Sequence, residues 1–296
     1  MRTAFIHQLL EEARANPAIF LLVGDLGYSV VEPFAEAFPD RFLNVGIAEQ
    51  NMTGIAAGLA MEGYNVFTYS IGNFPTLRCM EQIRYDVCYH ELSVKIVAVG
   101  GGYAYGPLGA SHHTTEDIAM LRSIPNMRVC APGDPAETKA ATAYFAHTQG
   151  PGYLRLGKAG EPLVHTNAIT DITKLQKVMD GEETAVLTTG GVLALAKNHI
   201  QSHQLKWGLY SVPFIKPIDF SGIGDVCRTY HTIYTIEEHQ RFAGFGSAVL
   251  ETINELYRQK HIQSFPQVCC IGIEDLFVSF AGSQEYLREM AGVKLP

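Results

Sequence analysis

Short, continuous apolar runs alternate with longer amphipathic stretches along the chain. The apolar runs are rich in β-branched and aromatic residues and are bounded by Gly, Pro or Asp, which is typical of parallel strands covered on both faces. On this pattern the sequence predicts strands at residues 19–23, 66–69, 94–99, 129–131, 185–188, 209–212, 233–236 and 268–273.

Amphipathic helices are predicted between these strands, at residues 3–15, 135–147 and 245–259. The second of them has a strong start signal, because Asp134 can cap the helix and Pro135 fits its first turn. Alternation of strands and helices is typical of an α/β fold with mostly parallel sheets. We therefore expect doubly wound α/β domains.

A cluster of Gly, Pro, Thr and Asn without periodicity occupies residues 157–183, as expected of a linker. The chain has 296 residues, enough for roughly two domains of typical size. The sequence therefore predicts a domain over 1–158, a linker over 159–182 and a second domain over 183–296.

Composition excludes several classes of function. Hydrophobic residues make up 47% and charged residues 18%, so the chain can build cores. The formal charge is −8 and no Lys/Arg run occurs, so we expect no binding to nucleic acid or to an anionic membrane. No apolar run approaches the ~18 residues of a membrane helix.

The start of the chain is unlike a signal peptide, and the six cysteines include no CxxC pair. These features favour a cytoplasmic protein without a metal site of its own.

One candidate for chemistry lies where a short strand runs into a helix rich in Gly and Ala, at residues 41–60. Such small residues let another backbone approach closely, which suits a tight interface or ordinary core packing. Glu49 stands at the strand-to-helix turn, where α/β sheets present ligand groups. Taken alone, an acidic residue at a helix start is most often a structural charge.

The segment Asn-Val-Gly-Ile-Ala-Glu-Gln-Asn-Met at residues 44–52 resembles the pyrimidine-domain motif of the transketolase family of thiamine-diphosphate enzymes. The resemblance implies that Glu49 is catalytic, a neutral carboxylic acid that hydrogen-bonds N1′ of the aminopyrimidine. Residues 69–84 resemble the family segment whose aromatic residue stacks on that ring, here Phe74. Ile47 and Arg78 are assigned to the cofactor on the same grounds.

A glycine-rich segment at residues 100–122 contains His112 and His113. It lacks the GxxxxGK[ST] pattern of a phosphate-binding loop, and two adjacent histidines point different ways, which disfavours joint metal ligation. The segment resembles the family's substrate loop, which implies that His112 contacts the reacting sugar oxygen and is catalytic. His113 fills a position where the family often has Gln, and Tyr103 is a further candidate for substrate contact.

The same loop departs from classical transketolases at two positions. Leu108 occupies the position where the family has an Asp that hydrogen-bonds a substrate hydroxyl. Gly100 occupies the position of a further family histidine. A site that pairs a hydroxyl discriminates strongly against its absence, so these changes imply a different sugar. Arg2, Ser29 and Arg155 fall near family positions that bind the terminal phosphate of the acceptor, so the resemblance implies an anionic sugar substrate.

The second half of the chain carries less chemistry. Glu237-Glu238-His239 and the glycine-rich turn after it resemble the family's C-terminal domain, where they organise the domain and its dimer contacts. The resemblance covers nearly the whole chain but only the later portion of a full-length transketolase.

The family binds Mg²⁺ and the cofactor's diphosphate through Gly-Asp-Gly and a downstream Asn. In this chain Gly24-Asp25 is followed by Leu, Gly133-Asp134 is followed by Pro, and Asp180-Gly181 lacks the first Gly. The resemblance therefore implies a split enzyme. A partner subunit would bind Mg²⁺ and diphosphate, and two copies of each chain would form an α2β2 heterotetramer with a homodimer contact.

The favoured activity is transfer of a two-carbon ketol unit from a ketose to an aldose. Two related activities stay open, a decarboxylating transfer like that of 1-deoxyxylulose-5-phosphate synthase and the β subunit of a 2-oxoacid dehydrogenase. A non-catalytic binding or regulatory subunit is the alternative from another class, because fold alone does not fix function.

Overall fold

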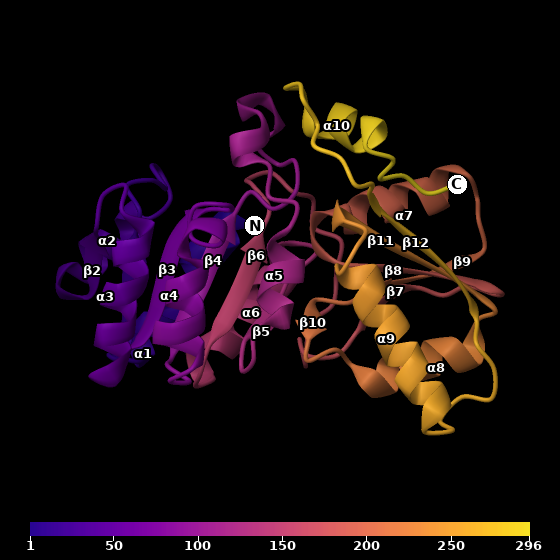
Figure 1. Cartoon of the computed structure of the whole chain (residues 1–296), viewed down its shortest axis with the longest axis horizontal. Coiled ribbons are helices and arrows are strands. Elements are labelled where there is room, and N and C mark those ends of the chain that lie inside the picture. The colour runs from indigo at the N-terminus through magenta and orange to yellow at the C-terminus, as the bar shows by residue number, and fades with distance from the viewer.

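The computed structural model describes residues 1–296 and contains two β-sheets side by side, each covered by helices (Figure 1). The helices are α1 (Arg2–Ala15), α2 (Glu32–Ala37), α3 (Glu49–Met61), α4 (Met80–Gln82), α5 (Asp117–Ser123), α6 (Pro135–His147), α7 (Leu193–Ser202), α8 (Phe220–Thr229), α9 (Phe245–Arg258) and α10 (Gln284–Met290). None of them combines the length and the apolarity that a membrane crossing requires.

The first sheet has seven strands in the order β10-β5-β6-β4-β3-β1-β2. They are β1 (Ile19–Val23), β2 (Phe42–Asn44), β3 (Asn65–Ile71), β4 (Val94–Val99), β5 (Arg128–Cys130), β6 (Gly152–Leu156) and β10 (Phe214–Lys216). All pair in parallel except β10, which runs antiparallel to β5. The helices α1, α2 and α6 contribute to the hydrophobic core on one face, and α3 and α5 contribute to the core on the other.

The second sheet has five strands in the order β12-β11-β8-β9-β7. They are β7 (Gln176–Met179), β8 (Thr184–Thr188), β9 (Trp207–Ser211), β11 (Thr232–Gln240) and β12 (Gln267–Ile273). Only β7 pairs antiparallel, with β9. Two mostly parallel α/β sheets confirm the predicted fold class, and each predicted strand overlaps an observed one.

Two strands lie outside the predicted division of the chain. Strand β7 falls within the segment 159–182 expected to be a linker, so the end of that segment belongs to the second sheet. Strand β10 follows β9 in sequence but extends the first sheet, where it pairs with β5. Both strands are short and lie at a sheet edge. Pro213 and Pro217 flank β10, and because proline is uncommon in strands the sequence pattern does not indicate a strand there. The division at residues 158 and 183 otherwise remains a prediction.

The two halves share a core. One hydrophobic cluster runs from Val129 and Ala131 in the first half to Ile215, Ile223 and Phe245 in the second. Helix α6 begins as predicted, since the Asp134 side chain accepts a hydrogen bond from the Glu137 amide at 2.8 Å. The loops that follow β1, β3, β4 and β6 all leave the carboxyl edge of the parallel sheet, which is where α/β folds bind ligands.

Candidate functional site

Glu49 is the first residue of α3, and only 1% of its surface is exposed. Its Oε2 lies 2.9 Å from Nη1 of Arg78, and its Oε1 accepts a hydrogen bond from the Ser70 hydroxyl at 3.2 Å. The helix N-terminus and the guanidinium both stabilise the ionised carboxylate. Each carboxylate oxygen of Glu49 thus has a donor within the chain, a guanidinium for one and a hydroxyl for the other.

Phe74 and His112 extend this arrangement. The Arg78 guanidinium lies 5.1 Å from the centre of the Phe74 ring. The Phe74 ring meets the half-buried His112 imidazole edge-on, with ring centres 5.4 Å apart. Three segments that are distant in sequence thus meet in one contiguous set, which consists of Glu49, Arg78, Phe74 and His112. Ile47, just before α3, is 79% exposed.

His113 and Tyr103 are buried and line a cavity together with Asn73 and Leu77. The His113 imidazole packs edge-on against the Tyr103 ring at 5.0 Å, and its Nε2 lies 3.2 Å from the carbonyl oxygen of Gly106. Both residues are buried, and burial raises the pKa of the Tyr103 phenol, as do the nearby Glu238 and Glu116 carboxylates. The structure does not bring these two side chains to the set around Glu49.

Arg155, near the end of β6, is also turned inward and is 4% exposed. Its Nε donates to Oδ2 of Asp117 at 2.7 Å, and its Nη2 donates to the carbonyl oxygens of Thr114 and Glu238 at 2.8 and 3.0 Å. Most of its donors are therefore used within the protein. Only Nη1 has no protein acceptor and faces a second cavity.

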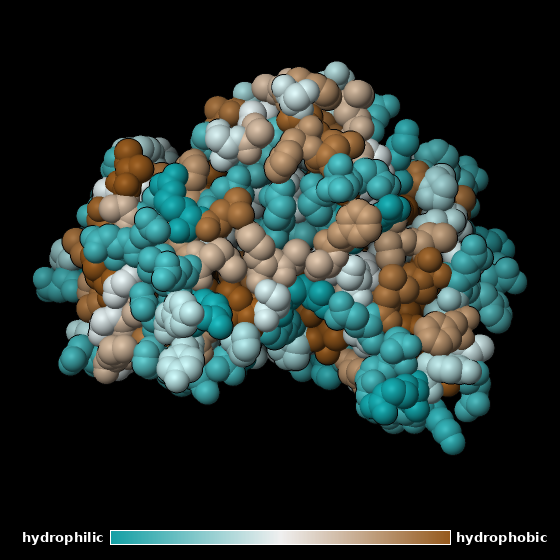
Figure 2. All heavy atoms as spheres, viewed as in Figure 1, coloured by the Kyte–Doolittle hydropathy of each residue, from teal (hydrophilic) through white to brown (hydrophobic).

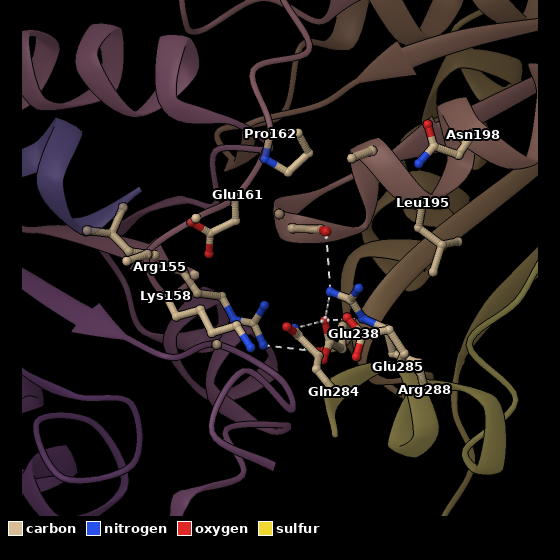
Figure 3. A pocket seen from close by; sticks show the side chains of 18 residues that line it. Arg155, Lys158, Glu161, Pro162, Leu195, Asn198, Glu238, Gln284, Glu285 and Arg288 are labelled. Atoms are coloured by element: carbon tan, nitrogen blue, oxygen red, sulfur yellow. Dashed lines mark hydrogen bonds and ion pairs between the residues drawn. The ribbon is translucent and has the colours of Figure 1, made fainter. Parts of the chain in front are cut away.

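That cavity, of about 400 Å³, lies between the two halves of the chain (Figure 3). Lys158, Glu161, Glu285 and Arg288 line it together with the glycines of the turn before α7. Lys158 points into it without a salt bridge, whereas Arg288 is paired with Glu238. Sequence inspection missed Lys158, because a lone lysine in a glycine-rich segment carries no distinctive signal.

The remaining substrate candidates lie on separate elements, Ser29 on the loop before α2 and Arg2 at the start of α1. Ser29 is exposed at a positive φ of 61°, and its amide donates to the Glu32 carboxylate at 2.7 Å. Arg2 lies beside the Tyr105 phenol. Burial raises the pKa of this phenol, and the Arg2 guanidinium acts to lower it. No contact joins Ser29, Arg2 and Arg155 to one another in the chain.

Tyr105 also explains the glycine at position 100. Gly100 has a φ of +91°, and a Cβ there would lie 2.2 Å from the Tyr105 ring. The histidine found at this position in classical transketolases therefore has no room here. Leu108, the second departure, is 55% exposed on the short turn Gly106–Leu108 and is free to meet a ligand or a partner.

Comparison with known proteins identifies the class. Residues 1–160 match the family model described as the transketolase pyrimidine-binding domain, and residues 173–275 match the transketolase C-terminal domain. The chain belongs to the transketolase family, whose members depend on thiamine diphosphate. This confirms the resemblance carried by residues 44–52.

Within the family, the chain is similar to separately encoded subunits. It is 36% identical over 265 residues to an apulose-4-phosphate transketolase subunit of Phocaeicola vulgatus, covering 86% of this chain and 83% of that protein. It is also 36% identical over 295 residues to a putative transketolase C-terminal section of Methanocaldococcus jannaschii, covering 97% and 90%. A solved split-gene transketolase described as an inactive β4 tetramer superimposes with a TM-score of 0.84 at 33% identity, covering 99% and 93%.

The residues present fit one half of the family's cofactor. A buried carboxylate at a helix start and a half-buried aromatic ring suit an aminopyrimidine, which needs a hydrogen-bond partner and a stacking surface. The fit does not extend to the Mg²⁺ and diphosphate motif of the family, since no Gly-Asp-Gly occurs in the chain. No group of three or more His, Cys, Asp or Glu side chains is placed to hold a metal either. The donor set around Glu49 is therefore compatible with the aminopyrimidine half of the cofactor.

Proposed function

We propose that the chain is the pyrimidine-binding subunit of a split transketolase that transfers a two-carbon ketol unit from a ketose to an aldose. The observation that carries the proposal is the buried Glu49 carboxylate, in one contiguous set with Phe74 and His112. A subunit that had lost its activity would have no reason to keep a carboxylate desolvated at this position, because burial of an ionised group costs free energy.

Each residue of the set has a distinct part in the proposal. Glu49 holds a proton at N1′ of the aminopyrimidine. The ring nitrogen N1′ therefore competes with the Arg78 guanidinium for the Glu49 carboxylate. Phe74 supports the aminopyrimidine ring by stacking, and Ile47 adds apolar contact. His112 donates a proton to, or accepts one from, the sugar oxygen at the reacting carbon. Thiamine diphosphate, when bound, supplies the nucleophilic carbon that carries the two-carbon unit.

The proposal requires a partner subunit that binds Mg²⁺ and the diphosphate. The surface around α3 supports this requirement, because Leu43, Ile47 and Met61 are exposed there. Gly54 and Gly58 face open space on the same helix, so another backbone can approach closely. Figure 2 shows hydrophobic residues gathered at the side of the molecule that carries α3. An α2β2 assembly would cover this surface.

We further propose an anionic sugar as substrate. In the cavity between the halves, Lys158 has no salt bridge and Nη1 of Arg155 has no protein acceptor, although Glu161, Glu238 and Glu285 line the same cavity. Arg2 lies outside the cavity, near Tyr105. Relatives named as transketolases for apulose 4-phosphate and for 6-deoxy-6-sulfo-D-fructose have anionic sugars in their names. Positions 100 and 108 lack the polar side chains that contact substrate in classical transketolases. We therefore favour a sugar whose hydroxyl groups at these contacts differ from those of the usual pentose phosphates.

A tagged pull-down from the native lysate tests the proposal. We expect a stoichiometric partner with Gly-Asp-Gly and a downstream Asn. The recovered complex should transfer a two-carbon unit between ketose and aldose phosphates only when thiamine diphosphate and Mg²⁺ are added. A chain that elutes alone as a folded homo-oligomer, inactive in every donor–acceptor pair, would contradict it.

A decarboxylating transfer is the second candidate. The chain is 34% identical over 269 residues to 1-deoxy-D-xylulose-5-phosphate synthase of Thermomicrobium roseum, although it spans only 41% of that protein. Release of CO₂ from pyruvate by the assembled complex, without ketose cleavage, would favour this activity over ketol transfer.

A further inference from the structure

The segment that carries His112 and His113 is closed into a loop by its own backbone. The Gly102 amide donates to the Thr114 carbonyl oxygen at 2.7 Å, and the Thr114 amide donates to the Gly102 carbonyl oxygen at 2.9 Å. The intervening residues have little regular structure beyond two short turns, Gly106–Leu108 and Ala110–His112. The position of this loop therefore depends on what holds its base and its flank.

The base of the loop is held by the end of strand β11, in the second sheet. One carboxylate oxygen of Glu238 accepts the Tyr103 amide at 2.7 Å. The approach is close, because a Cβ on Gly102 would lie 2.5 Å from the Glu238 carboxyl carbon, and Gly102 has a φ of +67°. The Arg155 guanidinium joins the Thr114 and Glu238 carbonyl oxygens, so it ties the other side of the base to the same residue.

Glu238 is in turn held by α10, which lies outside both segments matched by the transketolase domain models. Arg288 donates from Nε and Nη2 to one carboxylate oxygen at 2.9 and 2.6 Å, and Gln284 donates to the carboxylate at 3.0 Å (Figure 3). The Glu238 side chain is almost fully buried and that of Arg288 is nearly so. A buried carboxylate with this many charged and polar donors is fixed in orientation.

The flank of the loop meets the same C-terminal segment. The Gly106 carbonyl oxygen lies within reach of the Gly282 amide, at 3.4 Å, and of the His113 Nε2, at 3.2 Å. A Cβ on Gly106 would come within 2.7 Å of the Leu287 side chain, so the turn packs directly on α10. The Tyr103 ring, anchored through its amide, packs edge-on against His113.

We propose that Glu238 is a positioning residue and that, through Arg288 and Gln284, helix α10 sets the position of the loop that carries His112. The role of His112 in this inference rests on the proposed function. The second sheet and α10 thereby act on the reaction through the position of the loop. A displacement of about 1 Å of a reacting group can cost about 10²-fold in rate, so such an anchor has a measurable effect on turnover.

Hydrogen exchange of the full chain tests the anchor without a partner subunit. In Arg288→Gln we expect at least tenfold faster exchange in residues 102–116, and an intermediate rate in Arg288→Lys, which keeps the charge. Arg258→Gln removes an exposed ion pair in the same half of the chain and is the matched control. Unchanged exchange in residues 102–116 would overturn the anchor. If Arg288→Gln does not fold, Gln284→Ala removes a single donor and decides the same question.

Turnover by the complex recovered with the partner subunit tests the effect on the reaction. We expect the kcat of ketol transfer to fall about 10- to 100-fold in Arg288→Gln and to recover partly in Arg288→Lys. Faster loop exchange with an unchanged kcat would overturn the positioning role. A wild-type complex without ketol transfer would instead contradict the proposed function, and the exchange rates would still decide whether α10 holds the loop.

Discussion

Nη1 of Arg78 lies 2.9 Å from Oε2 of Glu49, and this ion pair joins a side chain that is 47% exposed to one that is 1% exposed. The buried carboxylate belongs to the first residue of a helix and accepts a hydrogen bond from Ser70 as well. The guanidinium, in contrast, has room to turn outward. Exchange of the Arg78 contact for another donor therefore needs no change in the backbone around Glu49.

The first prediction concerns Glu49. Glu49→Gln keeps the size of the side chain but cannot release or take up a proton, so the kcat of the assembled enzyme should fall by about 10²- to 10⁴-fold. The melting temperature of the chain should change little, because the half-exposed Arg78 is readily solvated. Glu62→Gln, at an exposed carboxylate beyond the end of α3, is the control and should keep full activity. An active Glu49→Gln enzyme would remove this residue from the mechanism.

The second prediction separates Arg155 from Lys158. Arg155→Met leaves the buried Asp117 carboxylate without its cation, so urea unfolding should show a loss of about 3–5 kcal/mol. Lys158→Met breaks no salt bridge and should leave stability unchanged, while it raises the KM of an anionic acceptor about tenfold. The KM of an uncharged aldose is the internal control. An equal effect of Lys158→Met on both acceptors would show that Lys158 does not read the anion.

The third prediction compares two glycines with positive φ in the glycine-rich segment 100–122. Gly109→Ala meets only backbone strain, because nothing lies within 4 Å of the added Cβ, and should cost about 1–3 kcal/mol. Gly100→Ala adds a contact with the Tyr105 ring and should cost clearly more. Urea unfolding of both variants gives the difference. Equal losses would mean that Tyr105 moves aside, and that the loop tolerates a side chain at position 100.

The fourth prediction is a pH dependence that comes from Glu137. Burial raises its pKa from 4.5 to about 7, although His165 and hydrogen bonds from Gly133 and Ser211 act in the opposite direction. The folded state thus holds a proton that the unfolded state has released between these pH values. The free energy of unfolding should therefore fall as the pH rises from 4.5 to 7, by about 3 kcal/mol at most.

His165 contributes in the same direction. Burial acts to lower its pKa, but the Asp134 and Glu137 carboxylates raise it above 6.5, so the stability from its charged form is lost as the pH rises past that raised pKa. Glu137→Gln should flatten the decline in urea-unfolding free energy between pH 5 and pH 8. Glu81→Gln, at an exposed carboxylate, is the control and should leave the decline in place. An unchanged slope in Glu137→Gln would assign the pH dependence to other groups.

The regular part of the fold could be predicted from the sequence, because continuous apolar runs have few alternatives to buried parallel strands. Strands β1 and β4 match their predicted bounds at both ends. Strand β11 extends past its predicted end into Glu237 and Glu238, whose charge disfavours a place in a core. Their carboxylates are buried because Phe245 and Gly246 amides satisfy one and Arg288 satisfies the other.

The candidate site could be proposed from the sequence where a short motif carries it, and not where the contacts are long-range. Residues 44–52 identified Glu49, and the structure places Phe74 and His112 in one contiguous set with it. Arg155 and His113 were named from the same kind of resemblance, yet both side chains bond inward. Nothing local in the sequence shows that Arg155 would meet Asp117, or that Arg288 would meet Glu238 fifty positions away.

The insertion of β10 into the first sheet has a consequence for synthesis. When residues 1–158 have left the ribosome, the edge of β5 still has no neighbour, and its pairing waits for Phe214–Lys216. The first sheet is therefore complete only after Phe214–Lys216, in the second half of the chain, has been translated. Until then an open strand edge is available to other chains, so the order in which this polypeptide emerges bears on its tendency to aggregate.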